Sequence, residues 1–382
     1  MFKEKKVMFW PVGTGDCTSI VLAEDVVLQV DMRCKEENGD QEGDGESLVD
    51  IFEENLPEVG GKPYLAGFAL THPDKDHVEG FADLLSRVDI GEIWFTPRVF
   101  AENDTDLCDD AVAFKEEAER RVNATIKCGG DVASGDRVRL IGYDQLLEED
   151  TYKGFPRERL TIPGNSINEL DGEDYTGEFN AFIHAPFAEQ IEGDRNNTSL
   201  CMQVTFSESP DMGGVLLFGD IAYPRIRKIF DTTKNAKNEE YLAWKVFLAP
   251  HHCSKSAMYQ KDGDREVLKQ DMLDDLDSYQ VLGGVIVASC DEIPARNQSG
   301  DNPPHAKAKQ RYEEIAEGGF LCTQEDTDGA EPIVFLIQDD GSLERDSGSD
   351  SSEGRSSGNL SAAVKQARGS DAPPSEKVGY GG

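Results

Sequence analysis

The sequence has few histidines, few basic residues relative to acidic ones, and no long apolar run. Its 382 residues include 6 His, with 75 Asp and Glu against 38 Lys and Arg, for a net charge of −37. No run approaches the ~18 apolar residues of a membrane helix, so we expect no membrane association. The acidity argues against a broad grip on DNA or RNA, because that affinity comes mostly from cationic side chains. A polyanionic substrate would therefore need local cations, metal ions included.

The cysteines also exclude some classes of protein. The eight cysteines are scattered and no two have the spacing of a zinc knuckle or redox motif. A chain of this length needs no disulfides for stability, so we predict a reduced, cytoplasmic protein. The basic start "MFKEKK" leads into an apolar segment that is too short for a secretory signal.

Short runs rich in β-branched and aromatic residues alternate with helical patterns along the chain. Two strand-rich halves with flanking helices predict an α/β protein with two sheets packed face to face and helices outside. The predicted strands are 7–12, 17–23, 26–31, 64–71, 179–185, 198–206, 214–220, 245–250, 284–290 and 332–337. The predicted helices are 78–88, 109–122, 223–231, and segments near 264–277 and 304–317.

Three segments stand apart in composition. The acidic, glycine-bearing segments 35–50 and 144–178 are predicted to be surface insertions. From residue 338 onward the chain is rich in Ser, Gly and Asp, and it cannot bury enough apolar surface to fold. We therefore predict one domain over 1–337 and a disordered acidic tail over 338–382, which could bind a protein partner. The role of its final Gly-Gly is open.

The histidines collect where strand-like runs end. "ALTHPDKDHVEGF" contains His72 and His77, while His184 and the pair His251 and His252 follow other runs. Asp31 and Asp220 end strands in the same way. Ligands gather at the carboxyl edge of such sheets, and a cluster of His and carboxylate at one edge makes a transition-metal site. A divalent ion would also relieve the repulsion among the acids of this loop.

Several motifs of the sequence resemble those of a known family. "THPDKDHVEG" is similar to the HxHxDH loop of metallo-β-lactamase-fold hydrolases, with Asp74 in place of the second histidine. The variant HPDxDH resembles most the hydrolase domain of ComEC-type competence proteins and their soluble relatives. "PVGTGDCTSIVL", "VVLQVD", "NNTSLCMQVTF", "VLLFGD", "LAPHHCSKSA" and "NPPHAKAKQRYEEI" resemble further motifs of that family in the same order. The resemblance covers residues 7–337 and implies a four-layer αββα fold.

The resemblance also implies a dinuclear centre holding two divalent ions, Zn or Mn. His72 and His184, with Asp74, would hold one ion, although Asp74 could instead orient His72. Asp76 and His77 would hold the second together with His251 or His252, and Asp220 would bridge the two. A carboxylate in place of an imidazole at Asp74 shifts the preference from Zn²⁺ toward Mn²⁺.

Such a centre would make a hydroxide available near neutral pH. Asp76 could orient this nucleophile or act as a base. His305 could bind a phosphate oxygen or protonate a leaving group, or else simply begin a helix after "NPP". Lys255, with its neighbouring serines, could bind an anionic substrate. Cys253 replaces a glycine of the family, which leaves the backbone geometry of that loop open.

Together these features predict a metal-dependent hydrolase acting on a phosphodiester, in a nucleotide or a nucleic acid strand. The acidity disfavours a long polymer, so the prediction is a phosphodiesterase in general rather than a nuclease in particular. The same metals could instead hydrolyse a carboxyl ester, amide or thioester. A third alternative is a non-enzymatic adaptor of a multi-protein system that works through its tail.

Overall fold

The computed structural model of the chain describes residues 1–34, 47–188, 195–263, 265–297, 300, 302–327 and 329–346. Within these ranges, Met1–Asp346 form one compact unit. Most of the predicted insertion 35–50 and most of the predicted tail lie outside the described residues.

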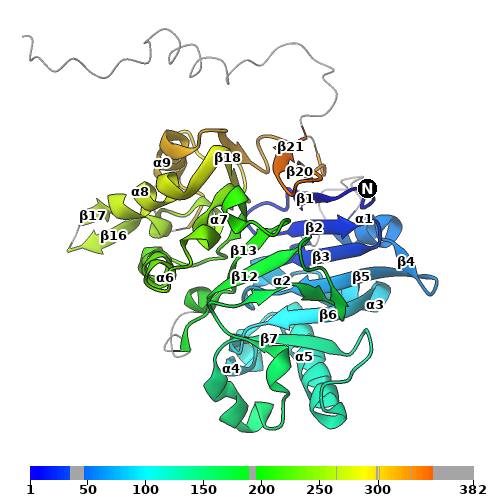
Figure 1. Cartoon of the computed structure of the whole chain (residues 1–382). Helices are drawn as coiled ribbons and strands as arrows, with labels where there is room; N and C mark the ends of the chain where they lie inside the picture. Colours follow the sequence, from blue (N-terminus) through cyan, green and yellow to red (C-terminus); the bar gives the residue numbers. More distant parts are fainter. Residues whose placement is uncertain are drawn as a thin grey trace, which may run out of the picture. The chain divides into compact units, whose positions relative to one another are not determined.

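The first sheet combines the N-terminal strands with the last two strands (Figure 1). Its order is β21-β20-β1-β2-β3-β5-β6-β7-β8, with β4 paired to β5. Strands β3, β5, β6 and β7 run parallel, so their carboxyl ends meet at one edge. The bounds are β1 Lys6–Phe9, β2 Thr18–Ala23, β3 Val26–Val30, β4 Glu58–Val59, β5 Lys62–Ala69, β6 Asp89–Phe95, β7 Arg137–Ile141, β8 Leu160–Thr161, β20 Ile333–Ile337 and β21 Leu343–Arg345.

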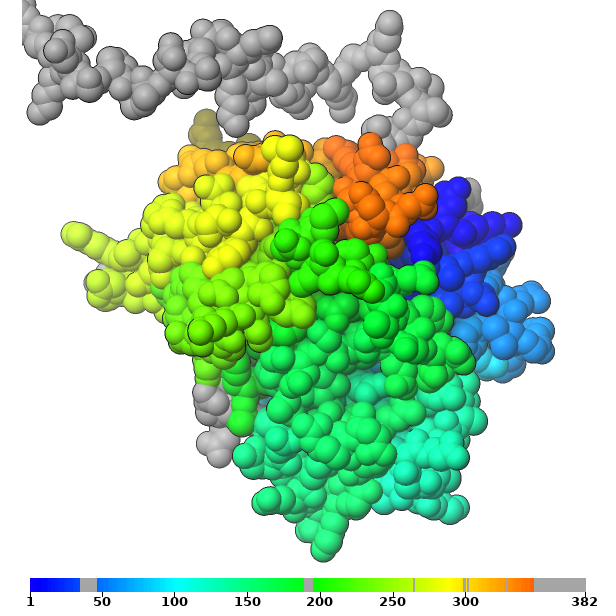
Figure 2. Space-filling model, viewed as in Figure 1, coloured from blue at the N-terminus to red at the C-terminus, as the bar shows by residue number. Residues whose placement is uncertain are grey.

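The second sheet comes from the later part of the chain and has the order β19-β18-β15-β14-β13-β12-β9. Strands β14, β15, β18 and β19 are parallel, so they too end at a common edge. The bounds are β9 Ser166–Ile167, β12 Asn180–Ala185, β13 Cys201–Thr205, β14 Gly214–Leu217, β15 Trp244–Leu248, β18 Gln280–Ala288 and β19 Phe320–Cys322. Two small hairpins complete the β structure: β10 Glu169–Leu170 with β11 Glu173–Asp174, and β16 Tyr259–Asp262 with β17 Arg265–Leu268, which projects from the surface (Figure 2).

Three hydrophobic clusters hold these elements together. One cluster joins the first sheet to α1, α3 and α5, through side chains such as Phe52, Phe81 and Phe114. A second contains side chains from both sheets, among them Phe9 and Val246. The third joins the second sheet to α6, α8 and α9, through side chains such as Phe230 and Tyr312. The α-helices are α1 Leu48–Asn55, α2 Lys75–Val78, α3 Phe81–Arg87, α4 Arg98–Ala101, α5 Asp109–Cys128, α6 Tyr223–Asn235, α7 Pro250–Cys253, α8 Gln270–Tyr279 and α9 Ala306–Ile315.

Local sequence explains where several helices begin and end. Ser47 and Asp50 form a reciprocal capping box at the start of α1. Gly129 ends α5 in the left-handed conformation, which costs glycine little. The helix predicted over 78–88 is interrupted. Helix α2 ends at Val78, and α3 begins after Gly80, whose φ of 96° is a conformation that glycine adopts readily.

Three sequence predictions need correction. The segment 144–178 is not a surface insertion, because it contains β8–β11 and buries Tyr152, Phe155 and Leu170. The predicted boundary at residue 337 is too early, because β21 pairs with β20 and continues the unit to Asp346. The helix predicted from 264 begins at Gln270, because the residues before it form the hairpin β16–β17.

In the part of the chain that the structure describes, no helix combines the length and the apolar character needed to cross a membrane.

Candidate metal centre

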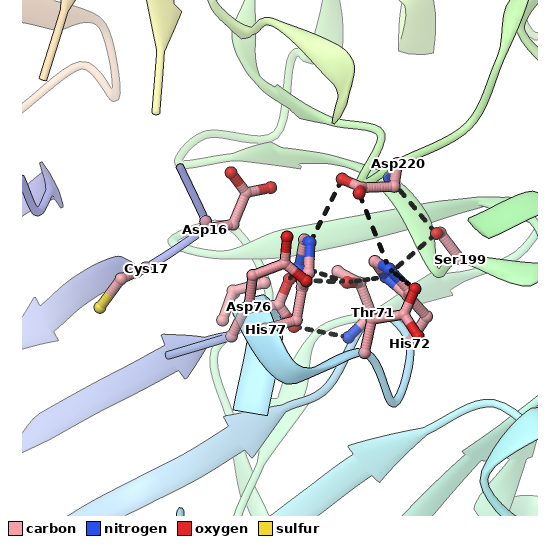
Figure 3. Close-up of polar contacts among 12 residues, drawn as sticks. Asp16, Cys17, Thr71, His72, Asp76, His77, Ser199 and Asp220 are labelled. Atoms are coloured by element: carbon pink, nitrogen blue, oxygen red, sulfur yellow. Dashed lines mark hydrogen bonds and ion pairs between the residues drawn. The ribbon is translucent and has the colours of Figure 1, made fainter. Parts of the chain in front are cut away.

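Polar loops follow the parallel strands of both sheets and meet at one edge. The loop after β5 carries His72, and α2 immediately after it carries His77. Asp220 follows β14, and His252 lies in α7 after β15. Figure 3 shows the imidazoles of His72 and His77 directed toward the carboxylate of Asp220. Residues far apart in the sequence therefore meet because strand ends from two sheets share an edge.

Four of these side chains form a compact Asp/His cluster: Asp16, His77, Asp220 and His252. One ligand atom from each lies within 4.8 Å of the others, and all four residues are buried. His77 Nε2 is 3.2 Å from Asp220 Oδ1, and His252 Nε2 is 3.4 Å from Asp220 Oδ2. Asp220 is therefore the carboxylate shared by both imidazoles.

The orientation of His77 is fixed by its other ring nitrogen. Its Nδ1 lies 2.7 Å from Asp31 Oδ2, and Asp31 also accepts hydrogen bonds from the backbone N–H and hydroxyl of Thr71 at 2.7 and 2.6 Å. With Nδ1–H donating to Asp31, the neutral ring directs the lone pair of Nε2 into the cluster.

His252 is held in the same way by the second sheet. Its Nδ1 lies 3.2 Å from the Ser289 carbonyl, just after β18, and 3.3 Å from Asp16 Oδ1. The Ser289 hydroxyl donates to the Gly15 carbonyl at 2.5 Å, which ties the loop bearing Asp16 to the same segment. The Asp16 loop also contacts helix α2, because the Asp16 N–H donates to the Asp76 carbonyl at 3.2 Å.

The electrostatics of the cluster favour a positive charge at its centre. Burial alone would lower the pKa of His77 and His252, but the carboxylates of Asp220 with Asp31 or Asp16 raise both values well above the ordinary range. Burial alone would raise the pKa of Asp220, but His252 and His77 lower it well below its ordinary value. A proton or a metal ion can supply this charge, and metal binding would then release protons.

A second group of side chains lies near Oδ2 of Asp220, the oxygen that His252 also approaches. His72 Nε2 lies 3.4 Å from Asp74 Oδ2 and 3.9 Å from Asp220 Oδ2, and His251 Nε2 lies 3.7 Å from Asp220 Oδ2. His72 Nδ1 is within 3.3 Å of the hydroxyls of Thr71 and Ser199, so its Nε2 faces this position. The other oxygen of Asp74 is 3.1 Å from Arg195 Nε.

The backbone at this edge is strained. Asp31, His251, His252 and Cys253 all have φ between 51° and 63°, a left-handed conformation that residues other than glycine seldom adopt. Such strain persists where the surrounding contacts fix it, and it is typical of functional sites. The Cys253 side chain is fully buried, and its φ of 63° lies in the region that favours glycine.

The donor set fits a divalent transition-metal ion. Among the described residues, Nε2 of His72, His77 and His252, with one oxygen each of Asp16 and Asp220, are buried without a hydrogen-bond partner. Buried polar atoms without partners are costly, and cations bound among them would satisfy these atoms. Imidazole nitrogen with carboxylate oxygen suits Zn²⁺ or Mn²⁺.

The structure does not bring His184 to this site, and its predicted role as a ligand is corrected. Its Nδ1 lies 3.2 Å from Thr233 Oγ1 and its Nε2 lies 3.1 Å from the Tyr241 carbonyl. Alternate residues of β12 face opposite sides: Ile183 packs between the sheets, while His184 packs on the outer face against Phe218. His184 there lines a cavity of about 340 Å³, away from the Asp/His cluster.

The predicted catalytic residues occupy different positions. Asp76 reaches the cluster, with Oδ2 3.3 Å from His252 Nε2, and its side chain stays 34% exposed. His305, the N-cap of α9, accepts a hydrogen bond at Nδ1 from the Lys255 backbone N–H at 3.3 Å. The Lys255 ammonium forms an ion pair with Glu266 at 2.9 Å, so it is already bound to an acid.

Sequence reasoning missed Asp16 and Ser199 as members of the site. Asp16 precedes a strand instead of following one, so the strand-end rule does not find it, although it lies in the quoted motif "VGTGDC". Ser199 contacts His72 and accepts the Asp220 N–H at 3.4 Å. Asp31 was noted as a strand-ending acid, but its contact with His77 could not be read from the sequence.

No family model matches this chain, and no curated protein matches it. Among solved structures, it is similar to a protein of unknown function from Enterococcus faecalis V583, with 9% identity and a TM-score of 0.32 over 85% of this chain and 78% of the other. It is also similar to an archaeal metallo-beta-lactamase superfamily protein from Sulfolobus tokodaii, with 11% identity and a TM-score of 0.30 over 83% of this chain and 98% of the other. Because both TM-scores are below 0.5, the interpretation of the site depends on this chain's own residues.

Proposed function

We propose that this protein is a metal-dependent hydrolase of the αββα metallo-β-lactamase type, and that its substrate is a phosphodiester. The four-layer arrangement is supported by the three hydrophobic clusters, one between the sheets and one between each sheet and its helices. The order of the sequence motifs, from "PVGTGD" to "NPPHAKAK", supports the same assignment.

One observation carries the proposal: buried imidazole nitrogens without hydrogen-bond partners converge on both carboxylate oxygens of Asp220. Asp16, His77, Asp220 and His252 would hold one divalent ion. His72, Asp74, Asp220 and His251 would hold the second, with Asp220 common to both. This assigns His251 and His252 to different ions. Compared with the sequence prediction, His251 takes the place of His184 beside His72 and Asp74, and Asp16 takes the place of Asp76 beside His77.

Divalent ions bound there would stabilise negative charge on phosphoryl oxygens and lower the pKa of water. The protein's own part is to hold the ligands in place and to manage protons. Asp31 and Ser289 orient His77 and His252. Asp76 is the most exposed of the carboxylates at the site, and burial would raise its pKa, but the imidazoles of His252 and His77 lower that pKa below its ordinary value. A lowered pKa keeps this carboxylate ionised, and an ionised, partly exposed carboxylate is suited to orient a water molecule by accepting a hydrogen bond from it.

Elemental analysis of the purified full chain tests the metal centre. We expect two equivalents of a transition metal, and a sharp loss in Asp220→Asn, because both positions share that carboxylate. Asp277→Asn, at an exposed position of α8, is the matched control and should keep its metal. A wild-type protein that takes up no Zn²⁺ or Mn²⁺ would contradict the proposal.

A substrate panel tests the reaction class. The metal-loaded protein should hydrolyse bis(p-nitrophenyl) phosphate, and EDTA or the Asp76→Asn change should abolish this activity. Equal or better activity on p-nitrophenyl acetate or a thioester would favour the carboxyl-ester alternative over the phosphodiesterase.

A further inference from the structure

Two lysines from distant parts of the chain share one carboxylate near the metal centre. Lys255 lies three residues after His252, and Lys307 lies in the first turn of α9. Glu266 of β17 pairs with Lys255 through Oε1 at 2.9 Å and with Lys307 through Oε2. Both lysine side chains are largely shielded from solvent, with exposures of 15% and 17%.

This arrangement is unusual in a chain with a net charge of −37. Burial lowers the pKa of Lys307, and the nearby Lys255 lowers it further, so the two ammonium groups disfavour one another. Other contacts fix both lysines in place: Lys255 Nζ donates to the Gly300 carbonyl at 2.8 Å, and Lys307 Nζ lies 4.3 Å from the centre of the Tyr259 ring. An anion bound by both ammonium groups balances their charge, and here the carboxylate of Glu266 supplies it.

The surroundings of Lys307 have room for a ligand. Lys307 lines a cavity of about 340 Å³ together with the cations Arg296 and Lys309 and the acid Glu313. The backbone of the Lys255 turn is joined to His305, the N-cap of that helix. Lys255 thus belongs to the loop that follows His252, while Lys307 lines a polar cavity in which three cations outnumber one carboxylate.

We propose that Lys255 and Lys307 form a binding subsite for a phosphate group, and that Glu266 occupies this subsite until a ligand displaces it. A phosphate carries more charge than a carboxylate and has more acceptor oxygens to bridge two ammonium groups. The inference deepens the proposed function, on which it rests, by predicting a substrate with a second anionic group beside the scissile phosphodiester.

Phosphate binding to the metal-free full chain tests this inference. Isothermal titration with inorganic phosphate is done in EDTA at constant ionic strength. We expect Glu266→Gln to bind phosphate about tenfold more tightly than the wild type, because the competing carboxylate is removed. Adding Lys307→Met to Glu266→Gln should reverse this gain.

A matched control is offered by Lys115, which pairs with Asp104 at 2.7 Å and also donates to the Glu102 carbonyl at 2.8 Å. Asp104→Asn frees one similar lysine and should not improve phosphate binding. Equal phosphate affinities of Glu266→Gln and the wild type would contradict the subsite. An equal gain in affinity in Asp104→Asn would contradict it too. In either case the Glu266 ion pairs would serve only to stabilise the hairpin.

A second variant and the absence of metal make the result of the titration interpretable. If Glu266→Gln unfolds, Glu266→Asp keeps the charge but withdraws the carboxylate by one methylene, and it should give a smaller gain of the same sign. Because the titration uses no metal and no turnover, phosphate binding without hydrolysis would leave the subsite intact and overturn only the proposed function. Hydrolysis without phosphate binding would overturn only the subsite.

Discussion

Asp31 and His77 form a buried pair at the edge of the first sheet, with Asp31 Oδ2 2.7 Å from His77 Nδ1. Asp31 itself has a left-handed backbone, which turns its carboxylate toward the loop after β5. The pair joins β3 to α2 and directs the opposite nitrogen of His77 at Asp220. The orientation of a proposed metal ligand therefore depends on an acid that would not touch the metal.

This pair leads to a prediction for Asp31→Asn. The amide cannot accept from His77 Nδ1–H and Thr71 as the carboxylate does, so His77 should lose its fixed tautomer. We expect metal affinity to fall about 10–100-fold, as is usual for such supporting contacts. Competition with a chromogenic chelator measures the change. Asp25→Asn, in the exposed turn before β3, is the control and should bind metal like the wild type.

Gly15 allows the Asp16 loop to approach α2 closely. A Cβ at position 15 would lie 2.6 Å from the Asp76 carbonyl and would also clash with the Arg33 side chain. We expect Gly15→Ala to displace Asp16 and to weaken metal binding while both sheets remain folded. Gly129→Ala, at the end of α5, should cost about 1 kcal/mol of stability without changing metal affinity. Equal metal affinities of Gly15→Ala and the wild type would show that the loop position is not important.

Metal should stabilise the folded protein, because the ligand set does not exist in the unfolded chain. At a free concentration of 100 times the dissociation constant, the expected gain is about 2.7 kcal/mol in the free energy of unfolding. Thermal denaturation with and without Zn²⁺ or Mn²⁺ measures this as a rise in Tm. Asp220→Asn should lose most of the rise. A comparable rise with Mg²⁺ or in Asp220→Asn would indicate binding elsewhere on this acidic surface.

His184 should make stability depend on pH without affecting metal binding. Burial lowers its pKa from 6.5 to about 4, so the unfolded chain binds a proton more readily than the folded one. Stability is then lost as the pH falls from about 6.5 to about 4, by about 3 kcal/mol from this group. Urea denaturation should show a smaller loss over that range in His184→Gln. If this variant lost a metal equivalent instead, the corrected assignment would be wrong.

The sequence predicted the site better than it predicted the contacts within it. Strand ends and motif order correctly placed His72, His77, Asp220, His251 and His252 at one edge. His184 was misplaced because a strand end specifies the edge but not the face, and the pairing register of β12 shifts between Ile183 and Ala185. Which of two adjacent histidines faces Asp16 depends on backbone angles that composition does not specify.

For the fold, too, the sequence predicts some strands and misses others. Strand runs such as 26–31 and 214–220 were close to β3 and β14, because β-branched and apolar residues mark buried strands. Strands β6 and β7 were not predicted, since "DIGEIWF" and "RVRLI" carry charges that pair only in the folded protein. One example is Glu92, which is buried with Arg139 3.6 Å away.

The pairing of β1 with both β2 and β20 has a consequence for biosynthesis. Lys6 lies opposite Leu336, and the loop that follows β1 carries Asp16 and is bonded to Ser289. Translation produces Asp16 and His77 well before Asp220 and His252, which follow Asp16 by more than two hundred residues. A nascent chain that ends before Asp220 lacks the carboxylate shared by both proposed metal positions, so binding of the proposed metals would follow synthesis of that part of the domain.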